Sequence, residues 1–214
     1  MMNFNISSIF LILFSHLSFV VAASSPLDDV VSRYRTSKLV SMDVVRTVKS
    51  KVLSKETKFV GKIYLSQSKF RWDTDAPEKT QIIFDGKTIW NIQHPSPELP
   101  GPLQVAKSKV DKNTKKQILL STLLGTSEIK ENFKILKTEN QKEEKIYFLE
   151  PKGNDIQVKN LEIHVANKKI SLISFKDDIG NQTDMAFKNI EFSKKGKSKL
   201  FQYSPPKEAQ VITL

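Results

Sequence analysis

Asp73 and Asp75 come nearest in this sequence to a catalytic arrangement. Two carboxylates at i and i+2 on a strand project from the same face, where they can divide acid and base roles as in some glycosidases. A second pair, Asp28-Asp29, stands near a predicted helix start, where negative charge favours the helix dipole. We interpret both pairs as structural, and we keep a secreted hydrolase that uses Asp73 and Asp75 as an alternative.

Other residues with reactive side chains are scarce. The 214-residue chain has no cysteine, which excludes disulfide scaffolds, cysteine-ligated zinc, iron–sulfur clusters and thiol catalysis. His94 lies in a proline-rich stretch and His164 in a strand pattern, and neither has a companion at metal-ligand spacing. The sequence contains no Gly-rich phosphate loop, H-E-x-x-H or G-x-S-x-G motif. We therefore predict a protein that is not an enzyme and needs no cofactor or metal.

The formal net charge is +11, from 34 Lys and Arg against 23 Asp and Glu. Two groups of lysines stand out in the sequence, namely Lys107, Lys109, Lys112, Lys115 and Lys116, and Lys194, Lys195, Lys197 and Lys199. Aromatic residues do not alternate with them as stacking platforms for nucleic acid would. We predict no nucleic-acid partner, and the charge is open to two interpretations: a solvated surface, or attraction to acidic lipid headgroups or an acidic partner.

Residues 1–23 form the predicted signal peptide. The segment from Ile6 to Ala23 is almost wholly apolar, and the small residues around Ala23 fit cleavage after it. A membrane anchor is the alternative, but polar residues interrupt the apolar run, which is short for a span. No cysteine is available for acylation, so the chain is not itself expected to be a lipoprotein. We expect export and one domain over residues 24–214.

Periodicity predicts a mainly β domain with two helices. Leu27, Val30, Val31 and Tyr34 share one face of a short helix, and residues 113–124 carry a wide leucine stripe typical of a second. Asp85-Gly86 between two apolar runs indicates a hairpin turn, and the prolines of residues 94–103 indicate a surface loop. Alternation or apolar runs predict strands at about 42–52, 59–66, 69–73, 81–84, 88–92, 133–136, 146–149, 161–165, 170–175 and 185–192.

The order of residues from Gly61 to Trp90 is distinctive. An alternating strand is followed by F-x-W at Phe70–Trp72, by Pro77, and by I-x-D-G-K-T-x-W ending at Trp90. This order resembles the LolA-like family of periplasmic outer-membrane lipoprotein carriers. The segment 201–206, F-Q-Y-S-P-P, is similar to the closing F-x-F-x-P-P strand and tail of that family.

The resemblance implies an unclosed antiparallel β-barrel, or half-barrel, with helices covering its concave side. It implies a periplasmic carrier that binds the acyl chains of triacylated lipoproteins and moves them from the inner to the outer membrane. The implied partners are an inner-membrane ABC transporter of the lipoprotein-releasing type and, where one exists, an outer-membrane receptor; we expect a monomer. By position, the resemblance assigns the lipid-binding cavity to Ile63, Leu65, Phe70, Trp72, Ile83 and Trp90, and the lid to Leu119, Leu120, Leu123 and Leu124.

One departure from the family pattern concerns lid control. Well-studied members carry Arg-Pro before the F-x-W segment, and here the matching stretch is Ser66-Gln67-Ser68-Lys69. Neither Gln67 nor Lys69 fully replaces the fork of donors that a guanidinium offers. Two alternatives on the same fold stay open, a carrier of another lipid or glycolipid and a periplasmic regulator that senses lipoproteins.

Overall fold

The computed structural model describes residues 26–67, 69–110, 129–153 and 158–214. In this part of the chain, twelve strands form one sheet in the order β12-β6-β5-β4-β3-β2-β1-β11-β10-β9-β8-β7. Neighbouring strands pair antiparallel, except for the parallel pair β12–β6. The two outer strands do not pair with each other in the described sheet, so the predicted unclosed, mainly β fold is confirmed. The elements are α1 (Pro26–Thr36), β1 (Leu39–Lys49), β2 (Glu56–Ser66), β3 (Lys69–Ala76), β4 (Thr80–Phe84), β5 (Thr88–Gln93), β6 (Gln104–Lys109), α4 (Ile129–Asn132), β7 (Phe133–Gln141), β8 (Glu144–Pro151), β9 (Lys159–Ala166), β10 (Lys169–Lys176), β11 (Gln182–Ser193), the 3₁₀ turn η1 (Ser198–Phe201) and β12 (Gln210–Thr213).

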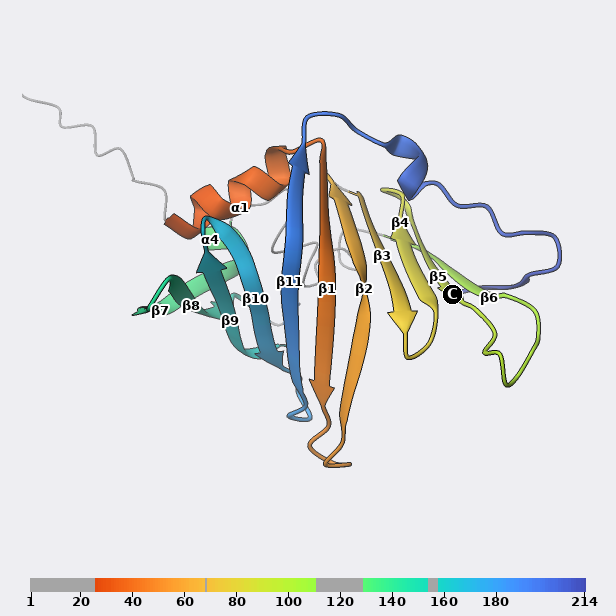
Figure 1. Cartoon of the computed structure of the whole chain (residues 1–214), viewed down its shortest axis with the longest axis horizontal. Helices are drawn as coiled ribbons and strands as arrows, with labels where there is room; N and C mark the ends of the chain where they lie inside the picture. Colours follow the sequence, from red (N-terminus) through yellow and green to blue (C-terminus); the bar gives the residue numbers. More distant parts are fainter. Residues whose placement is uncertain (1–25, 68, 111–128, 154–157) are drawn as a thin grey trace, which may run out of the picture.

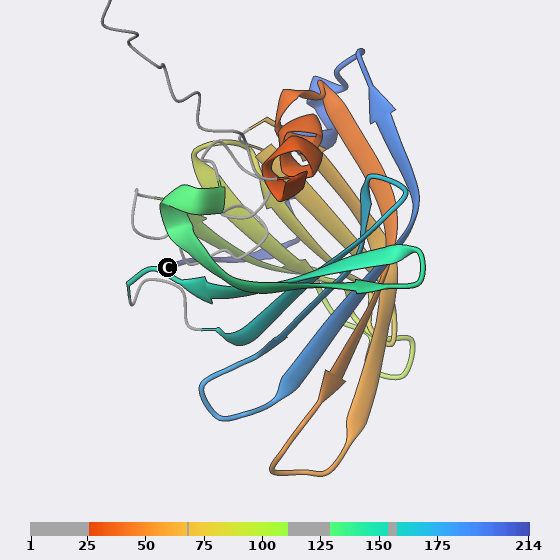
Figure 2. The same cartoon turned by 90° about the vertical axis from the view of Figure 1, so that its left-hand side faces the viewer.

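The sheet curves strongly, and α1 and α4 lie on its concave side at one end (Figures 1 and 2). As predicted, α1 buries Leu27, Val30, Val31 and Tyr34, which recur at helical spacing along one face. Its first turn carries Asp28 and Asp29, as the dipole interpretation requires. No helix among the described residues is long and apolar enough to cross a membrane.

The main apolar cluster fills the space between these helices and the sheet. Strands on both sides of the central strand β1 contribute to it, so distant parts of the chain share one core. Its buried members are Leu27, Val30, Val31, Tyr34, Val40, Met42, Val44, Ile63, Leu65, Ile129, Phe133, Tyr147, Leu149, Leu161, Ile163, Val165, Ile170, Ile173, Met185, Phe187 and Ile190.

The hairpin predicted at Asp85-Gly86 is confirmed between β4 and β5. Gly86 has φ +105°, a conformation that L residues rarely adopt. The Asp85 side chain accepts hydrogen bonds from the amides of Lys87 and Thr88, both at 2.8 Å. Burial alone would raise the pKa of Asp85, but these bonds to its charged form outweigh burial and hold the pKa below its ordinary value.

A second, smaller cluster lies where the C-terminal segment covers β4, β5 and β6. Ile83, Ile92 and Val105 form its buried centre, and Trp90, Leu103, Tyr203 and Ala209 pack against it. The indole of Trp90 meets the ring of Tyr203 edge-on, with centroids 5.4 Å apart. Ile83 and Ile92 alternate along their strands with residues that point to the other face, so β4 and β5 have apolar contacts on both sides.

Several predicted boundaries differ from the observed ones. β1 ends at Lys49, and Val52 lies exposed in the following turn. Phe201 ends η1, so the expected closing strand is replaced by β12 further along. The sequence analysis did not predict β6, in which Val105 and Ala106 are the only apolar residues, or α4, which has four residues. The helix expected over residues 113–124 and the signal peptide lie outside the described residues.

Candidate functional site

The concave face of β2 and β3 carries four of the residues that the family resemblance assigned to a cavity. Ile63 pairs with Trp72 and Leu65 pairs with Phe70, and directly paired residues project from the same face of a sheet. Ile63 and Leu65 are buried in the main cluster, while Phe70 and Trp72 pack against it and stay partly exposed. Phe70 also contacts the ring of Phe84, with centroids 5.9 Å apart. The apolar face is therefore closed near α1 and accessible further along the strands.

Ile83 and Trp90 are not brought to this face. Ile83 pairs with Arg71 on one side and with Trp90 on the other, whereas Phe70 and Trp72 pair with Phe84 and Ile82. Ile83 and Trp90 thus belong to the second cluster, under the C-terminal segment. The register of the β3–β4 hairpin decides this placement, because a shift of one residue exchanges the two faces.

Arg46 is a member of the concave face that the sequence interpretation missed. It pairs with Phe59 on β2 and with the buried Met185 on β11, and it follows Met42 and Val44 in the same alternation. Its guanidinium carbon lies 4.2 Å from the ring centroid of Phe59 and 5.2 Å from that of Trp72. The sequence does carry a sign of this residue, because Arg46 is a cation at the inward-facing position between Val44 and Val48.

The closed end of the face is fixed by a buried tyrosine. The backbone amide of Ile170 on β10 donates a hydrogen bond of 2.9 Å to the hydroxyl of Tyr34 on α1. The Tyr34 ring meets Phe192 edge-on at 5.0 Å, and Arg33 lies 4.0 Å above the Phe192 ring. Burial raises the pKa of Tyr34 to about 12. The predicted lid residues Leu119, Leu120, Leu123 and Leu124 lie outside the described residues.

The carboxylates considered for catalysis are held in structural contacts or stand apart. Arg71 donates from Nε to both carboxylate oxygens of Asp73 at 2.9 Å, and Gln81 donates to the same group at 3.0 Å. Asp75 is exposed and borders a groove of about 770 Å³ along the proline-rich loop, beside His94. The described residues contain no group of three or more His, Asp or Glu side chains placed to hold a metal ion.

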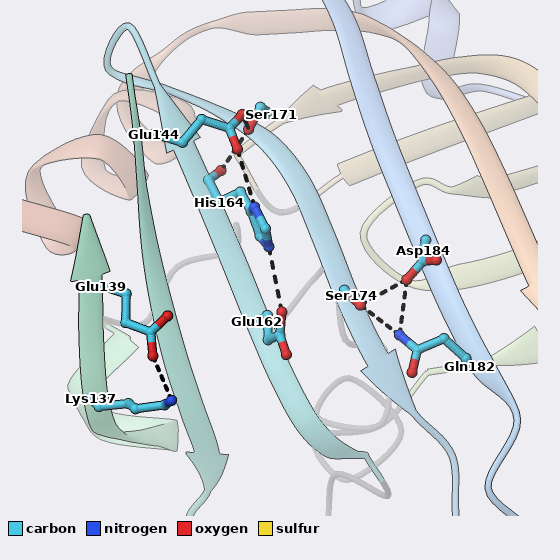
Figure 3. A network of polar contacts seen from close by, with 9 residues as sticks. All are labelled: Lys137, Glu139, Glu144, Glu162, His164, Ser171, Ser174, Gln182 and Asp184. Atoms are coloured by element: carbon cyan, nitrogen blue, oxygen red, sulfur yellow. Dashed lines mark hydrogen bonds and ion pairs between the residues drawn. The ribbon is translucent and has the colours of Figure 1, made fainter. Parts of the chain in front are cut away.

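His164 lies in a polar network on the outer face of the sheet (Figure 3). Its Nδ1 is 3.3 Å from Glu144, and its Nε2 is 3.5 Å from Glu162, an ion-pair distance without a hydrogen bond. The Ser171 hydroxyl donates to Glu144 at 2.9 Å, and this bond together with the His164 contact keeps the pKa of Glu144 below its ordinary value. Ser171 bonds to Glu144 and not to the imidazole, so the arrangement lacks the nucleophile–base contact that a triad needs.

The stretch that replaces the family's Arg-Pro borders a basic groove. The groove measures about 370 Å³ and is lined by Lys38, Ser66, Gln67, Lys69, Gly196, Lys197, Ser198 and Phe201. Lys194, Lys195 and Lys199, in or beside the connection that contains Lys197, are exposed as well. The second predicted lysine cluster is thus a solvent-facing rim, while Lys112, Lys115 and Lys116 of the first lie outside the described residues.

A strongly curved, unclosed sheet with an apolar and partly accessible concave face defines a class of proteins that can shelter an apolar ligand. Residues 35–204 match the family described as outer membrane lipoprotein carrier protein LolA. This match covers well over half of the chain, so the chain belongs to the LolA family.

Curated relatives agree with this assignment. The outer-membrane lipoprotein carrier protein of Pseudomonas syringae pv. tomato is 30% identical over 146 residues, which are 67% of this chain and 66% of that protein. The protein of the same name from Azotobacter vinelandii is 27% identical over 144 residues, with the same coverage. The chain thus spans slightly less than two thirds of the length of these relatives.

Among solved structures, an uncharacterized conserved protein from Thermus thermophilus has a TM-score of 0.51 at 14% identity, covering 89% of this chain and 100% of that one. This likeness shows a shared fold. A LolA superfamily protein from Nitrosomonas europaea has a TM-score of 0.47 at 10% identity, covering 84% and 99%.

Proposed function

We propose that this protein is a periplasmic carrier that holds the acyl chains of lipoproteins against its concave face and moves them from the inner to the outer membrane. The observation that carries the proposal is the row of partly exposed aromatic side chains, Phe59, Phe70 and Trp72, on the face that the main core closes at one end. Membership of a family named for lipoprotein carriage, rather than for catalysis, supports it.

The physical requirement for such a carrier is simple. Each methylene group moved from water to an apolar environment gains about 0.8 kcal/mol, so acyl chains leave a membrane only when another apolar surface receives them. An unclosed sheet can supply that surface because its two outer strands need not separate from each other to admit a chain. The residues proposed for contact on this face are Ile63, Leu65, Phe70 and Trp72, with Phe59 beside them.

The proposed partners follow from this role. Residues 1–23 would direct export, an inner-membrane ABC transporter of the lipoprotein-releasing type would load the carrier, and an outer-membrane receptor, where one exists, would unload it. The basic rim around Lys38, Lys69 and Lys197 offers these partners or an acidic membrane surface a complementary charge.

A lipopeptide-retention assay tests the carrier role. A synthetic tripalmitoylated lipopeptide is mixed with the purified protein, aggregates are removed by centrifugation, and the lipopeptide left in the supernatant is measured. We expect the wild-type protein to retain it, and Phe59→Gln to retain at least about fivefold less, because an amide facing acyl chains loses its hydrogen bonds at a cost of about 1–3 kcal/mol.

Val60→Gln is the matched control, since Val60 is the next residue on β2, is 47% exposed, and faces the opposite side. Equal losses in the two variants would show that the concave face is not the binding surface. Absence of retention by the wild type would contradict the carrier role itself. Mass spectrometry of protein isolated from its native host would separate lipoprotein cargo from a free lipid or glycolipid.

A further inference from the structure

Arg46 is a cation on an apolar surface, and the described residues offer it no anionic partner. Among the described residues, no carboxylate lies within ion-pair distance of its guanidinium, and its buried Nε donates no hydrogen bond. Its neighbours across the two strand pairings are Phe59 and Met185, and Trp72 lies nearby. Burial lowers the pKa of Arg46 below its ordinary value, yet an arginine stays protonated at neutral pH.

The aromatic contacts stabilise the positive charge of Arg46, but they accept none of its hydrogen bonds. A cation over an aromatic ring gains electrostatic attraction through the faces of the guanidinium. The five N–H groups point outward in the plane of the guanidinium, and each requires an acceptor that an aromatic face does not supply. Arg46 is partly exposed and only its Nε is fully buried without an acceptor, and a partly desolvated charge gains most when an opposite charge also accepts its hydrogen bonds. An oxyanion that accompanies an acyl chain would meet both needs.

We propose that Arg46 forms an oxyanion site within the acyl-binding face, so that the protein binds acyl chains with a carboxylate or phosphate head more tightly than neutral chains of equal length. The site rests on the proposed function, because it requires that acyl chains occupy the concave face. It extends that function to acidic amphiphiles, whose head would lie at the edge of Arg46 between Phe59 and Trp72.

Fluorescence titration with cis-parinaric acid and with its methyl ester tests the site. The two probes share one polyene chain and differ in the charge of the head. We expect the wild-type protein to bind the acid about tenfold more tightly than the ester, a difference typical of hydrogen bonds to charged groups. Arg46→Met, which keeps an apolar stem, is expected to bind both probes with the affinity of the ester, and Arg46→Lys to recover part of the preference.

Arg33→Met is the matched control, since Arg33 also stacks on an aromatic ring but is exposed on α1. Equal affinity of the wild type for both probes, or an equal loss for both in Arg46→Met, would overturn the oxyanion site and leave acyl binding standing. Failure of both probes to bind the wild type would contradict the proposed function instead. Displacement of the acid probe by lysophosphatidic acid, compared with palmitate, identifies phosphate or carboxylate as the preferred head.

Discussion

Gly61 belongs to the stretch that resembles the LolA family, and its neighbours show its structural role. Gly61 begins the distinctive stretch, and β2 and β3 approach each other closely there. A Cβ built on Gly61 would lie 2.0 Å from the carbonyl oxygen of Asp73 and 2.9 Å from the Cα of Thr74. Both are backbone atoms, which cannot rotate away as a side chain could. A glycine is therefore required at this position by the strand pairing and its irregular register.

Gly61→Ala should accordingly destabilise the protein. We expect the free energy of unfolding to fall by about 1–3 kcal/mol, because the pair of strands must separate to admit the methyl group. Urea denaturation followed by circular dichroism measures the change. Gly101→Ala serves as control, since no atom lies within 4 Å of a Cβ built there, and its midpoint should stay near the wild-type value. An unchanged midpoint in Gly61→Ala would refute this close approach.

At the scale of elements, the predicted cavity residues share the concave face only in the β2–β3 hairpin. Ile63, Leu65, Phe70 and Trp72 share a face because β2 and β3 pair directly and carry one apolar face each. In β4 and β5, consecutive apolar residues such as Ile82-Ile83 and Ile89-Trp90 occupy both faces, so alternation could not say which of them points inward. The cover on the outer face comes from residues about 110 positions later in the chain, and a single sequence does not show such a contact.

The helix α1 is also held to the sheet by a contact that periodicity could not reveal. Helical spacing predicted that Tyr34 would be buried, but not that its hydroxyl would accept the amide of Ile170. Removal of the hydroxyl would leave that buried amide without its partner, which costs about 1–3 kcal/mol. Tyr34 thus joins α1 to β10, and its ionisation would place an unfavourable negative charge in a buried site.

Tyr34→Phe should therefore change how stability depends on pH. The pKa of Tyr34 is about 12 in the folded protein, against about 10 in an unfolded chain. Above pH 10 the unfolded state loses this proton first, so the contribution of Tyr34 to stability is complete below pH 10 and falls as the pH rises toward 12. We expect the wild-type advantage over Tyr34→Phe to shrink by about 2 kcal/mol across that window. Parallel curves of unfolding free energy against pH for the two proteins would contradict the raised pKa.

At the scale of the whole molecule, one sheet separates two apolar environments. The main cluster and the partly open face lie on its concave side, whereas Ile83, Ile92 and Val105 lie on the outer side under the C-terminal segment. On the concave side, the partly exposed Phe59 and Trp72 lie beside Arg46, which has no carboxylate within ion-pair distance among the described residues.

The two tryptophans of this chain stand on opposite sides of that sheet, so they are two optical reporters of different compartments. Bromine atoms on an acyl chain quench indole emission on contact. In Trp90→Phe, whose emission comes from Trp72 alone, 9,10-dibromostearate should quench fluorescence as it binds. In Trp72→Phe, where Trp90 alone emits beside Tyr203, the same concentrations should leave the emission unchanged. Quenching of Trp90 would place the acyl chain on the outer face, and quenching of Trp72 alone would let cargo arrival and departure be followed in real time without an attached label.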